Sequence, residues 1–227
     1  MIRFAPLLVA VLVAFVMYRV SAWKTGKTLD AQSTILRDPD LMRLTGKMAR
    51  QLGVPRIKVN IYEVDPINGL AAPDGRIFIT RGFMRKYADG IVTAEELASV
   101  IAHELGHVAL GHSKRRMIDF GAQNAMRILL MGIIGRILPF GGIYLVNFLL
   151  SLLGAKLSRQ DEYEADAYAA ALLTKAGIGV APQIALFEKL DYLAGKTGGQ
   201  TAWLMSHPKT PDRIAAIRRL EKSWSRG

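Results

Sequence analysis

The segment that organises this chain runs from Thr93 to Arg116 and has the sequence TAEELASVIAHELGHVALGHSKRR. Its middle, residues 103–107, is the motif HELGH, and two histidines four residues apart on a helix lie one turn apart on the same face. Both imidazoles can therefore reach one zinc ion. Glu104 lies roughly 100° round the helix from His103, where it can act on a metal-bound water. The motif alone is only a hypothesis, because a short polar pattern also arises by chance in buried helices.

The residues on either side of HELGH predict that the motif lies on a helix. Thr93 and Glu96 have the spacing of a capping box, in which each side chain binds the backbone amide of the other residue. Glu95 near the start and the basic residues 114–116 near the end match the helix dipole. An inward-packing apolar stripe is formed by Leu97, Val100, Ile101, Val108 and Gly111.

The composition narrows the classes of function. The chain has 227 residues, a net charge of +11, 51% hydrophobic residues and no cysteine. Without cysteine there is no disulfide, thiol nucleophile or thiolate zinc ligand, so histidine, aspartate and glutamate remain to bind metal. The basic residues are dispersed without interleaved aromatic residues, which argues against nucleic acid and favours lipid headgroups or a solvated basic surface.

Residues 1–23 are predicted to be an N-terminal membrane anchor. The uncharged apolar run 4–18 is flanked by Arg3 and Arg19, and snorkelling of both arginines makes the segment long enough for a bilayer. The alternative is a signal peptide cleaved after residues 20–22, against which the nearby Arg19 argues. The basic residues that follow would hold the body in the cytoplasm, whereas a secretory-type start places it on the opposite face. The sequence leaves the face undecided.

Residues 24–37 are predicted to be a polar linker, and residues 38–227 a single mainly helical domain of the α+β class. A helix is expected to begin at Asp38, followed by strands. The predicted strands are residues 57–62, 68–72 and 76–80, of which the last two form a hairpin. A small β-sheet therefore precedes the motif helix.

Residues 117–157 are predicted to form a hydrophobic helical hairpin inserted in the domain. The uncharged stretch 137–155 is broken at residues 139–142, Pro-Phe-Gly-Gly, which predicts the turn. Each arm is too short to span a bilayer alone, so the hairpin either dips into the membrane or covers the site as a lid. A new helix is expected to begin at Ser158 and to stop at Gly177. Two further helices are expected over residues 182–193 and 210–220.

A zinc site needs a third protein ligand from elsewhere in the chain. A third histidine in the spacing used by some zinc enzymes would fall at Ser113, so a downstream carboxylate is needed. Residues 158–166, SRQDEYEAD, offer Glu162 and Asp166 four residues apart on one helix face. One of the two can bind the metal while the other steadies a ligand histidine. Glu164 lies roughly 200° round that helix and is expected to point elsewhere.

Four segments in order resemble those of a known family. HELGH, then SRQDEYEAD, then SHPKTPDRI at residues 206–214, together with NGLAAP at residues 68–73, are similar to the membrane-associated zinc endopeptidases typified by the heat-shock protease HtpX and the CAAX-prenyl endopeptidase. The resemblance covers roughly residues 38–222. The chain departs from the multispanning members because it has one N-terminal hydrophobic segment.

The resemblance implies a zincin-like fold of the gluzincin type with one zinc ion per chain. It implies that His103, His107 and Glu162 bind the zinc and that Glu104 is the general base. It further implies that Asp166 hydrogen-bonds His103, and that Asn68 and His207 lie near the substrate.

The predicted function is a zinc metalloendopeptidase at a membrane, the bacterial inner membrane in particular. Its expected partners are a protein or peptide substrate and the lipid bilayer. The edge strand with Asn68, Gly69, Leu70 and Ala71 would pair with an extended peptide backbone and read little of its side chains, which favours unfolded or damaged proteins as substrates. His207 would donate an N–H to the oxyanion that forms at the scissile carbonyl.

Two other classes of function compete with a peptidase. A membrane-bound holdase would keep the fold without peptide turnover, and its sequence would have lost Glu104 or a metal ligand, which this chain retains. A nucleotide enzyme would need a phosphate-binding loop. The tripeptide GKT occurs at 26–28 and 195–197, but the residues five positions before each glycine are Ser21 and Leu190 rather than glycine, so no nucleotide partner is expected.

Overall fold

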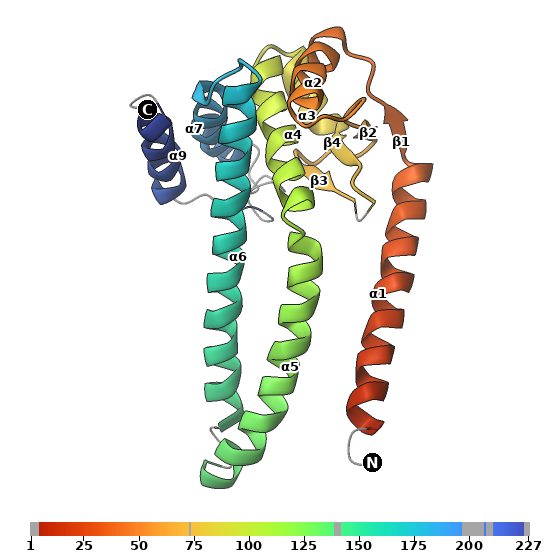
Figure 1. The fold of residues 1–227 in the computed structure, drawn as a ribbon, viewed down its shortest axis with the longest axis vertical. Coiled ribbons are helices and arrows are strands. Elements are labelled where there is room, and N and C mark those ends of the chain that lie inside the picture. The colour runs from red at the N-terminus through yellow and green to blue at the C-terminus, as the bar shows by residue number, and fades with distance from the viewer. Residues whose placement is uncertain (1–4, 73, 139–141, 197–206, 208–210, 225–227) are drawn as a thin grey trace. The chain divides into compact units, whose positions relative to one another are not determined.

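The computed structural model describes residues 5–72, 74–138, 142–196, 207 and 211–224 (Figure 1). The elements in chain order are α1 (Ala5–Ala31), β1 (Ser33–Ile35), α2 (Pro39–Gln51), β2 (Val59–Tyr62), β3 (Gly69–Ala71), β4 (Ile77–Thr80), α3 (Arg81–Ala88), α4 (Ala94–Ala109), α5 (His112–Ile137), α6 (Gly142–Lys175), α7 (Ala181–Lys196) and α9 (Pro211–Trp224). The predicted class, α+β and mainly helical with a small sheet, is confirmed.

The chain divides into two compact units. We call Met1–Lys27 with Gly111–Asp161 the helical unit, and Thr28–Leu110 with Glu162–Gly227 the core unit. The long helix α6 belongs to the helical unit up to Asp161 and to the core unit from Glu162.

The core unit contains a four-stranded sheet in the order β1-β2-β4-β3. The predicted hairpin is confirmed, because β3 pairs antiparallel with β4 in the register Gly69↔Ile79. β2 runs parallel to β4 and antiparallel to β1. Residues 24–37, expected to be a linker, instead continue α1 to Ala31 and then form β1. This strand escaped prediction because its stabilising partner, β2, is remote in sequence.

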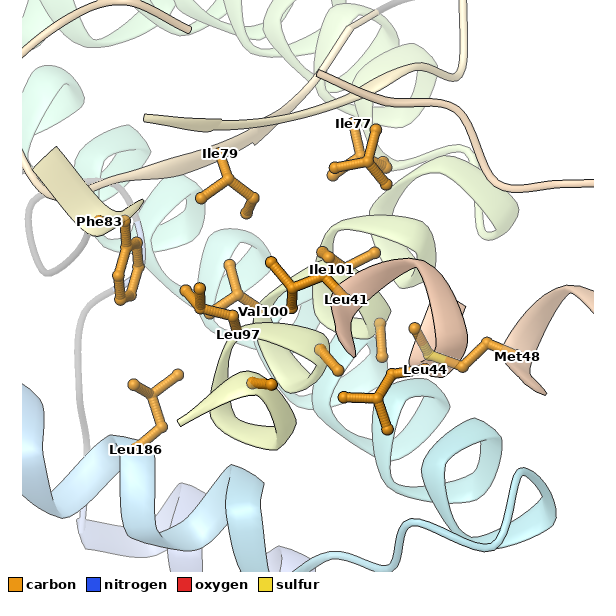
Figure 2. Packing of buried hydrophobic residues seen from close by; sticks show 14 of the residues in the cluster. Leu41, Leu44, Met48, Ile77, Ile79, Phe83, Leu97, Val100, Ile101 and Leu186 are labelled. Carbon is orange, nitrogen blue, oxygen red and sulfur yellow. The ribbon is translucent and has the colours of Figure 1, made fainter. Parts of the chain in front are cut away.

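One layer of helices packs on one face of this sheet (Figure 2). Ile77 and Ile79 of β4 face Leu97 and Ile101 of α4, and all four side chains are fully buried. The same cluster takes in the α2 side chains Leu41, Leu44 and Met48. Each of these side chains contributes about 1.5–3 kcal/mol through burial, so α4 is held at the centre of the unit.

The start of α4 is fixed by its cap, as predicted. The Thr93 hydroxyl accepts from the Glu96 amide at 3.2 Å, and a Glu96 carboxylate oxygen accepts from the Thr93 amide at 2.8 Å. Glu96 is buried and also forms an ion pair with Lys189 of α7 at 2.8 Å. The first turn of α4 is thus fastened both to its own backbone and to α7.

The helical unit contains most of α1, α5 and the first part of α6. The expected helix start at Ser158 is wrong, because α6 runs unbroken over 34 residues. No proline occurs in it, so nothing stops the helix until Gly177, whose φ of 66° suits a chain reversal. The expected hairpin turn falls largely on residues 139–141, which lie outside the described residues. Arg115 and Arg116 of α5 donate to buried Asp161 of α6 at 3.2 and 3.0 Å.

The membrane prediction concerns the same unit. No helix within the described part of the chain is long and apolar enough to cross a membrane. The first four residues of the predicted anchor lie outside the described residues. Several large apolar side chains on α5 and α6 are nevertheless exposed to solvent, among them Ile128 at 74%, Tyr144 at 76% and Phe148 at 58%.

Candidate metal centre

The centre is built from three parts of the core unit. Near its C-terminal end, α4 presents His103, Glu104 and His107, of which His103 and Glu104 are 2% exposed and His107 is 7% exposed. α6 presents Glu162, 2% exposed, and the segment before α9 presents His207, 6% exposed. The capped and well-packed α4 therefore places three of the predicted residues, and α6 and the later segment bring the others to it.

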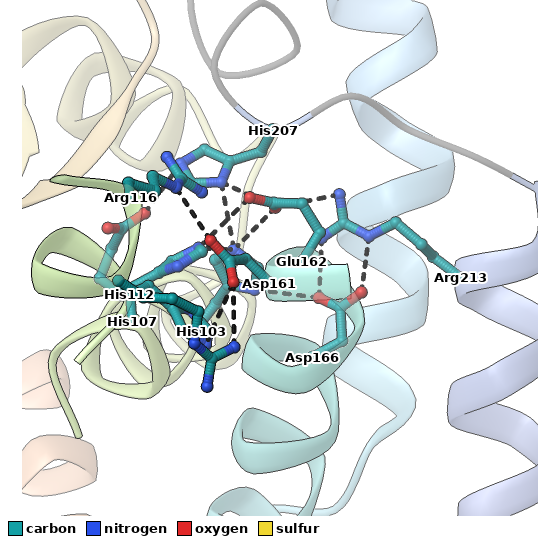
Figure 3. Close-up of polar contacts among 11 residues, drawn as sticks. His103, His107, His112, Arg116, Asp161, Glu162, Asp166, His207 and Arg213 are labelled. Atoms are coloured by element: carbon teal, nitrogen blue, oxygen red, sulfur yellow. Dashed lines mark hydrogen bonds and ion pairs between the residues drawn. The ribbon is translucent and has the colours of Figure 1, made fainter. Parts of the chain in front are cut away.

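The two α4 histidines and Glu162 converge on one point (Figure 3). The Nε2 atoms of His103 and His107 lie 3.1 Å apart. One Glu162 oxygen lies 3.3 Å from His103 Nε2, and the other lies 3.4 Å from His107 Nε2. Two nitrogens and two oxygens thus face the same small volume.

His207 faces this volume as well. Its Nδ1 lies 2.9 Å from Glu162 Oε2 and 3.3 Å from His103 Nε2, while its Nε2 lies 3.3 Å from Glu104 Oε1. One ligand atom from each of His103, His107, Glu162 and His207 can be chosen so that all four lie within 4.8 Å of one another.

The residues present suit a metal ion of the zinc type. Imidazole nitrogens and a carboxylate oxygen are the donors zinc takes in proteins that lack thiolate ligands, and a catalytic site uses three of them. Glu104 adds a second indication: its Oε1 is fully buried at the centre, where it faces His207 Nε2 at 3.3 Å without a hydrogen bond of regular geometry to any described residue. A buried carboxylate oxygen is costly unless it is well hydrogen-bonded, so its position beside the nitrogen and oxygen donors suits a bound water or ion.

Asp166 and Arg213 support the donors from behind. His103 Nδ1 donates to Asp166 Oδ1 at 2.9 Å, which leaves Nε2 facing the centre. Arg213 donates to both oxygens of Asp166, at 2.6 and 2.8 Å, and lies 3.4 Å from Glu162. Its guanidinium is stacked on the Phe187 ring at 4.7 Å.

Arg213 was missed by the sequence prediction, although it is only 1% exposed. A lone arginine on an amphipathic helix is usually solvated, so its position alone gives no signal. The signal lay in the segment SHPKTPDRI, whose arginine follows the His-Pro pair that the resemblance had singled out.

The charges in the centre act on one another. Burial lowers the pKa of His207, but its contacts with the carboxylates of Glu104 and Glu162 outweigh this and raise the pKa to about 9. Burial raises the pKa of Asp166, but hydrogen bonds from Arg213 and His103 hold it below its ordinary value. Asp166 is therefore an ionised acceptor that keeps a proton on the Nδ1 of His103, with Nε2 turned toward the centre.

The absence of a Cβ atom at Gly106 lets α4 and α6 approach each other at the centre. A Cβ atom built on Gly106 would meet the Cα and O atoms of Ala165 at 3.0 Å. This glycine lies between His103 and His107, and Ala165 lies between Glu162 and Asp166. The separation of α4 and α6 at the centre is thus set by backbone contact.

The predicted substrate strand is β3, at one edge of the sheet and in contact with α4. The Asn68 amide donates to the Thr80 hydroxyl at 2.9 Å, and the Asn68 side-chain oxygen accepts from the Gly69 amide at 3.0 Å. These bonds fix the start of β3 against β4. Gly69, Leu70 and Ala71 pair with β4 on one side, so the other side of this edge strand faces away from the sheet.

A helix with two histidines and a glutamate, faced by a carboxylate from a second helix, defines the class of metal-dependent peptidases with a zincin-like centre. Comparison with protein families places the chain within this class. Residues 36–221 match peptidase family M48, and the chain belongs to that family. It is therefore a metalloendopeptidase, a hydrolase of peptide bonds.

Individual relatives agree with this assignment. The metalloprotease LoiP of Escherichia coli (strain K12) is 30% identical over 178 residues, which cover 78% of this chain and 68% of LoiP. The metalloprotease YcaL of the same strain is 30% identical over 179 residues, or 78% of this chain and 67% of YcaL. Protease HtpX of Pasteurella multocida (strain Pm70) is 26% identical over 216 residues, or 80% of this chain and 72% of HtpX. The expected resemblance to HtpX is confirmed.

Proposed function

We propose that this protein is a zinc-dependent endopeptidase that cleaves extended segments of unfolded or damaged proteins at a membrane. The observation that carries the proposal is the convergence of His103, His107 and Glu162 beside the buried carboxylate of Glu104. A merely structural metal site has no use for such a carboxylate.

One zinc ion per chain would be held by His103 Nε2, His107 Nε2 and the Glu162 carboxylate. When bound, zinc supplies a water of lowered pKa and polarises the scissile carbonyl. Asp166 and Arg213 keep His103 in the tautomer and orientation that this role requires, since they fix its Nδ1 side.

Glu104 is the general base of the proposed reaction. Its Oε1 takes a proton from the attacking water and later passes it to the leaving amine. His207 supports the reaction from its position beside Glu104. Its Nε2 lies 3.3 Å from Glu104, so a ring N–H there can turn to the oxyanion as charge develops on the carbonyl oxygen.

The substrate backbone would pair with β3. The outer edge of Gly69, Leu70 and Ala71 offers main-chain donors and acceptors next to α4, whose histidines hold the metal. Pairing of this kind needs an extended chain and reads few side chains, which suits unfolded or damaged proteins.

The lipid bilayer is the second proposed partner, and the bacterial inner membrane the proposed location. The apolar run in residues 4–18 and the exposed apolar side chains of α5 and α6 support this. A form that starts at Trp23 is expected to float with liposomes, because the α5 and α6 side chains still need cover. Monomeric behaviour of that form without detergent would contradict membrane contact by α5 and α6.

The full-length protein in detergent, incubated with unfolded casein, tests the catalytic proposal. We expect cleavage that stops on addition of a zinc chelator and returns with added zinc. Glu104→Gln should keep one zinc per chain and lose cleavage, whereas Glu95→Gln in the first turn of the same helix should match the wild type. Cleavage by Glu104→Gln at the wild-type rate would overturn the mechanism.

A further inference from the structure

A second concave site lies in the core unit, away from the metal centre. It is a groove of about 280 Å³ lined by residues of β1, α2, β2 and the segment that leads into β2. Its apolar lining includes Ile35, Leu36, Met42, Ile57 and Val59. None of the lining residues belongs to the metal centre, and none of them is acidic.

Two large apolar side chains at this groove are open to solvent. Ile35 is 68% exposed and Met42 is 55% exposed, while Leu36 and Val59 beside them are buried at 6% each. Single exposed apolar side chains are ordinary, but two that line one concavity over a buried apolar floor make a surface that an apolar partner can cover.

The charged residues that line the groove are all basic. Arg56 and Lys58 are both exposed, and neither forms an ion pair with any residue that the structure describes. Arg76, the third cation of the lining, is already engaged by Asp30 at 2.5 Å and Asp74 at 2.7 Å. Two uncompensated cations beside an apolar floor favour a partner with acidic side chains.

The groove also adjoins a strand edge. β1 is the first strand of the sheet, and Leu36 donates to Val59 at 3.3 Å while Glu63 donates to Gln32 at 2.8 Å. In an antiparallel pair the bonded residues alternate, so the backbone groups of Ile35 face away from β2. An extended chain laid there meets main-chain groups as well as the side chains of the groove.

We propose that this groove is an exosite, which binds an extended segment of the substrate protein with an acidic side chain next to an apolar one, remote from the bond that is cut. Only the identity of the partner rests on the proposed function. β1 and β3 are opposite edges of one sheet, three strand spacings or about 14 Å apart. The bound segment therefore lies more than roughly four extended residues from the scissile bond. A substrate that occupies both sites has a raised effective concentration at the metal centre, so long substrates should bind more tightly than short ones.

Direct binding tests the groove without any need for cleavage. The probe is a fluorescent peptide of alternating glutamate and leucine, titrated by anisotropy into the full-length Glu104→Gln protein in detergent. Adding Arg56→Glu and Lys58→Glu should weaken binding about tenfold or more. The matched control, Lys175→Glu with Arg219→Glu, makes the same change in net charge elsewhere in the core unit and should bind within about twofold. Equal affinity of the groove and control variants, or equal binding of a lysine–leucine peptide, would overturn the exosite.

Cleavage kinetics then test whether the partner is the substrate protein, with the groove variant Arg56→Glu/Lys58→Glu made in a protein that keeps Glu104. For a long substrate with an acidic, apolar segment several residues from the cleaved bond, the groove variant should raise KM about tenfold at constant kcat. Its kcat/KM for a short peptide that cannot reach the groove should be unchanged. A parallel loss on both substrates would overturn the assignment of the substrate as partner. Absence of cleavage by every form would instead overturn the proposed function, and the anisotropy result would still decide the groove.

Discussion

Replacing Arg213 with methionine tests whether the buried ion pair behind His103 holds the centre together. Arg213 is 1% exposed and Asp166 is 2% exposed, and two short hydrogen bonds join them. Methionine keeps apolar bulk next to Phe187 but leaves the buried Asp166 carboxylate with the His103 N–H as its one remaining donor among the residues that the structure describes. Removal of one partner from a buried ion pair costs about 3–5 kcal/mol of folding stability. Because both side chains are buried, water screens the remaining charge very little and the full cost is expected.

The measurement is urea unfolding of the zinc-free protein in detergent, followed by circular dichroism. We expect Arg213→Met to lower the free energy of unfolding by about 3–5 kcal/mol. In the double variant Arg213→Met/Asp166→Asn, no unpaired carboxylate remains, so its loss should be at least about 1 kcal/mol smaller than the sum of the two single losses. A loss below about 1 kcal/mol for Arg213→Met, or additive losses in the double variant, would refute the reasoning. Zinc affinity, measured separately by competition with a chromogenic chelator, should fall roughly 10–100-fold in Arg213→Met because His103 loses its support.

Three further substitutions, one of them with a matched control, probe the centre. Glu162→Gln should abolish stoichiometric zinc binding measured by atomic emission, whereas Glu164→Gln on the same helix should retain one zinc per chain; zinc loss in the second variant alone would reverse the assignment. Gly106→Ala places a methyl group against the Ala165 backbone, so it should lower the free energy of unfolding by about 1–3 kcal/mol and weaken zinc binding. Thermal unfolding with and without zinc measures both effects. Unchanged zinc affinity would mean that α4 and α6 can move apart without disturbing the centre. His207→Ala should reduce kcat about 10²–10³-fold with zinc content intact, and an unchanged kcat would remove His207 from the reaction.

The parts of the fold that depend on neighbouring residues were predictable from the sequence. The cap of α4 uses Thr93 and Glu96, three positions apart, and the β3–β4 hairpin closes over a short turn. The motif helix and its two histidines followed directly. β1 was missed because its polar sequence gains stability only from pairing with β2.

The remaining misses have the same physical origin. Ser158 has the composition of a helix cap, but a cap operates only where the preceding chain leaves the helix, and here α6 continues. Arg213 is buried against the carboxylate of Asp166 in α6, which lies 47 residues earlier in the sequence. Contacts between residues so far apart in the sequence are set by tertiary packing, so the residue pattern of a single helix does not predict them.

In the proposed zinc site both histidine ligands lie on α4, and this placement would make the stability of the folded chain depend on the supply of zinc. α4 carries Leu97 and Ile101 into the core and His103 and His107 into the centre, so a disordered α4 would lose the core and the ligands together. Any ligand that binds only the folded state stabilises it by mass action, by about 4.1 kcal/mol when its free concentration is 1,000 times its dissociation constant. Zinc scarcity would then lower the amount of folded enzyme as well as its activity, because unfolded molecules are removed by other proteases. The cellular abundance of this protein would in that case report the zinc status of its compartment.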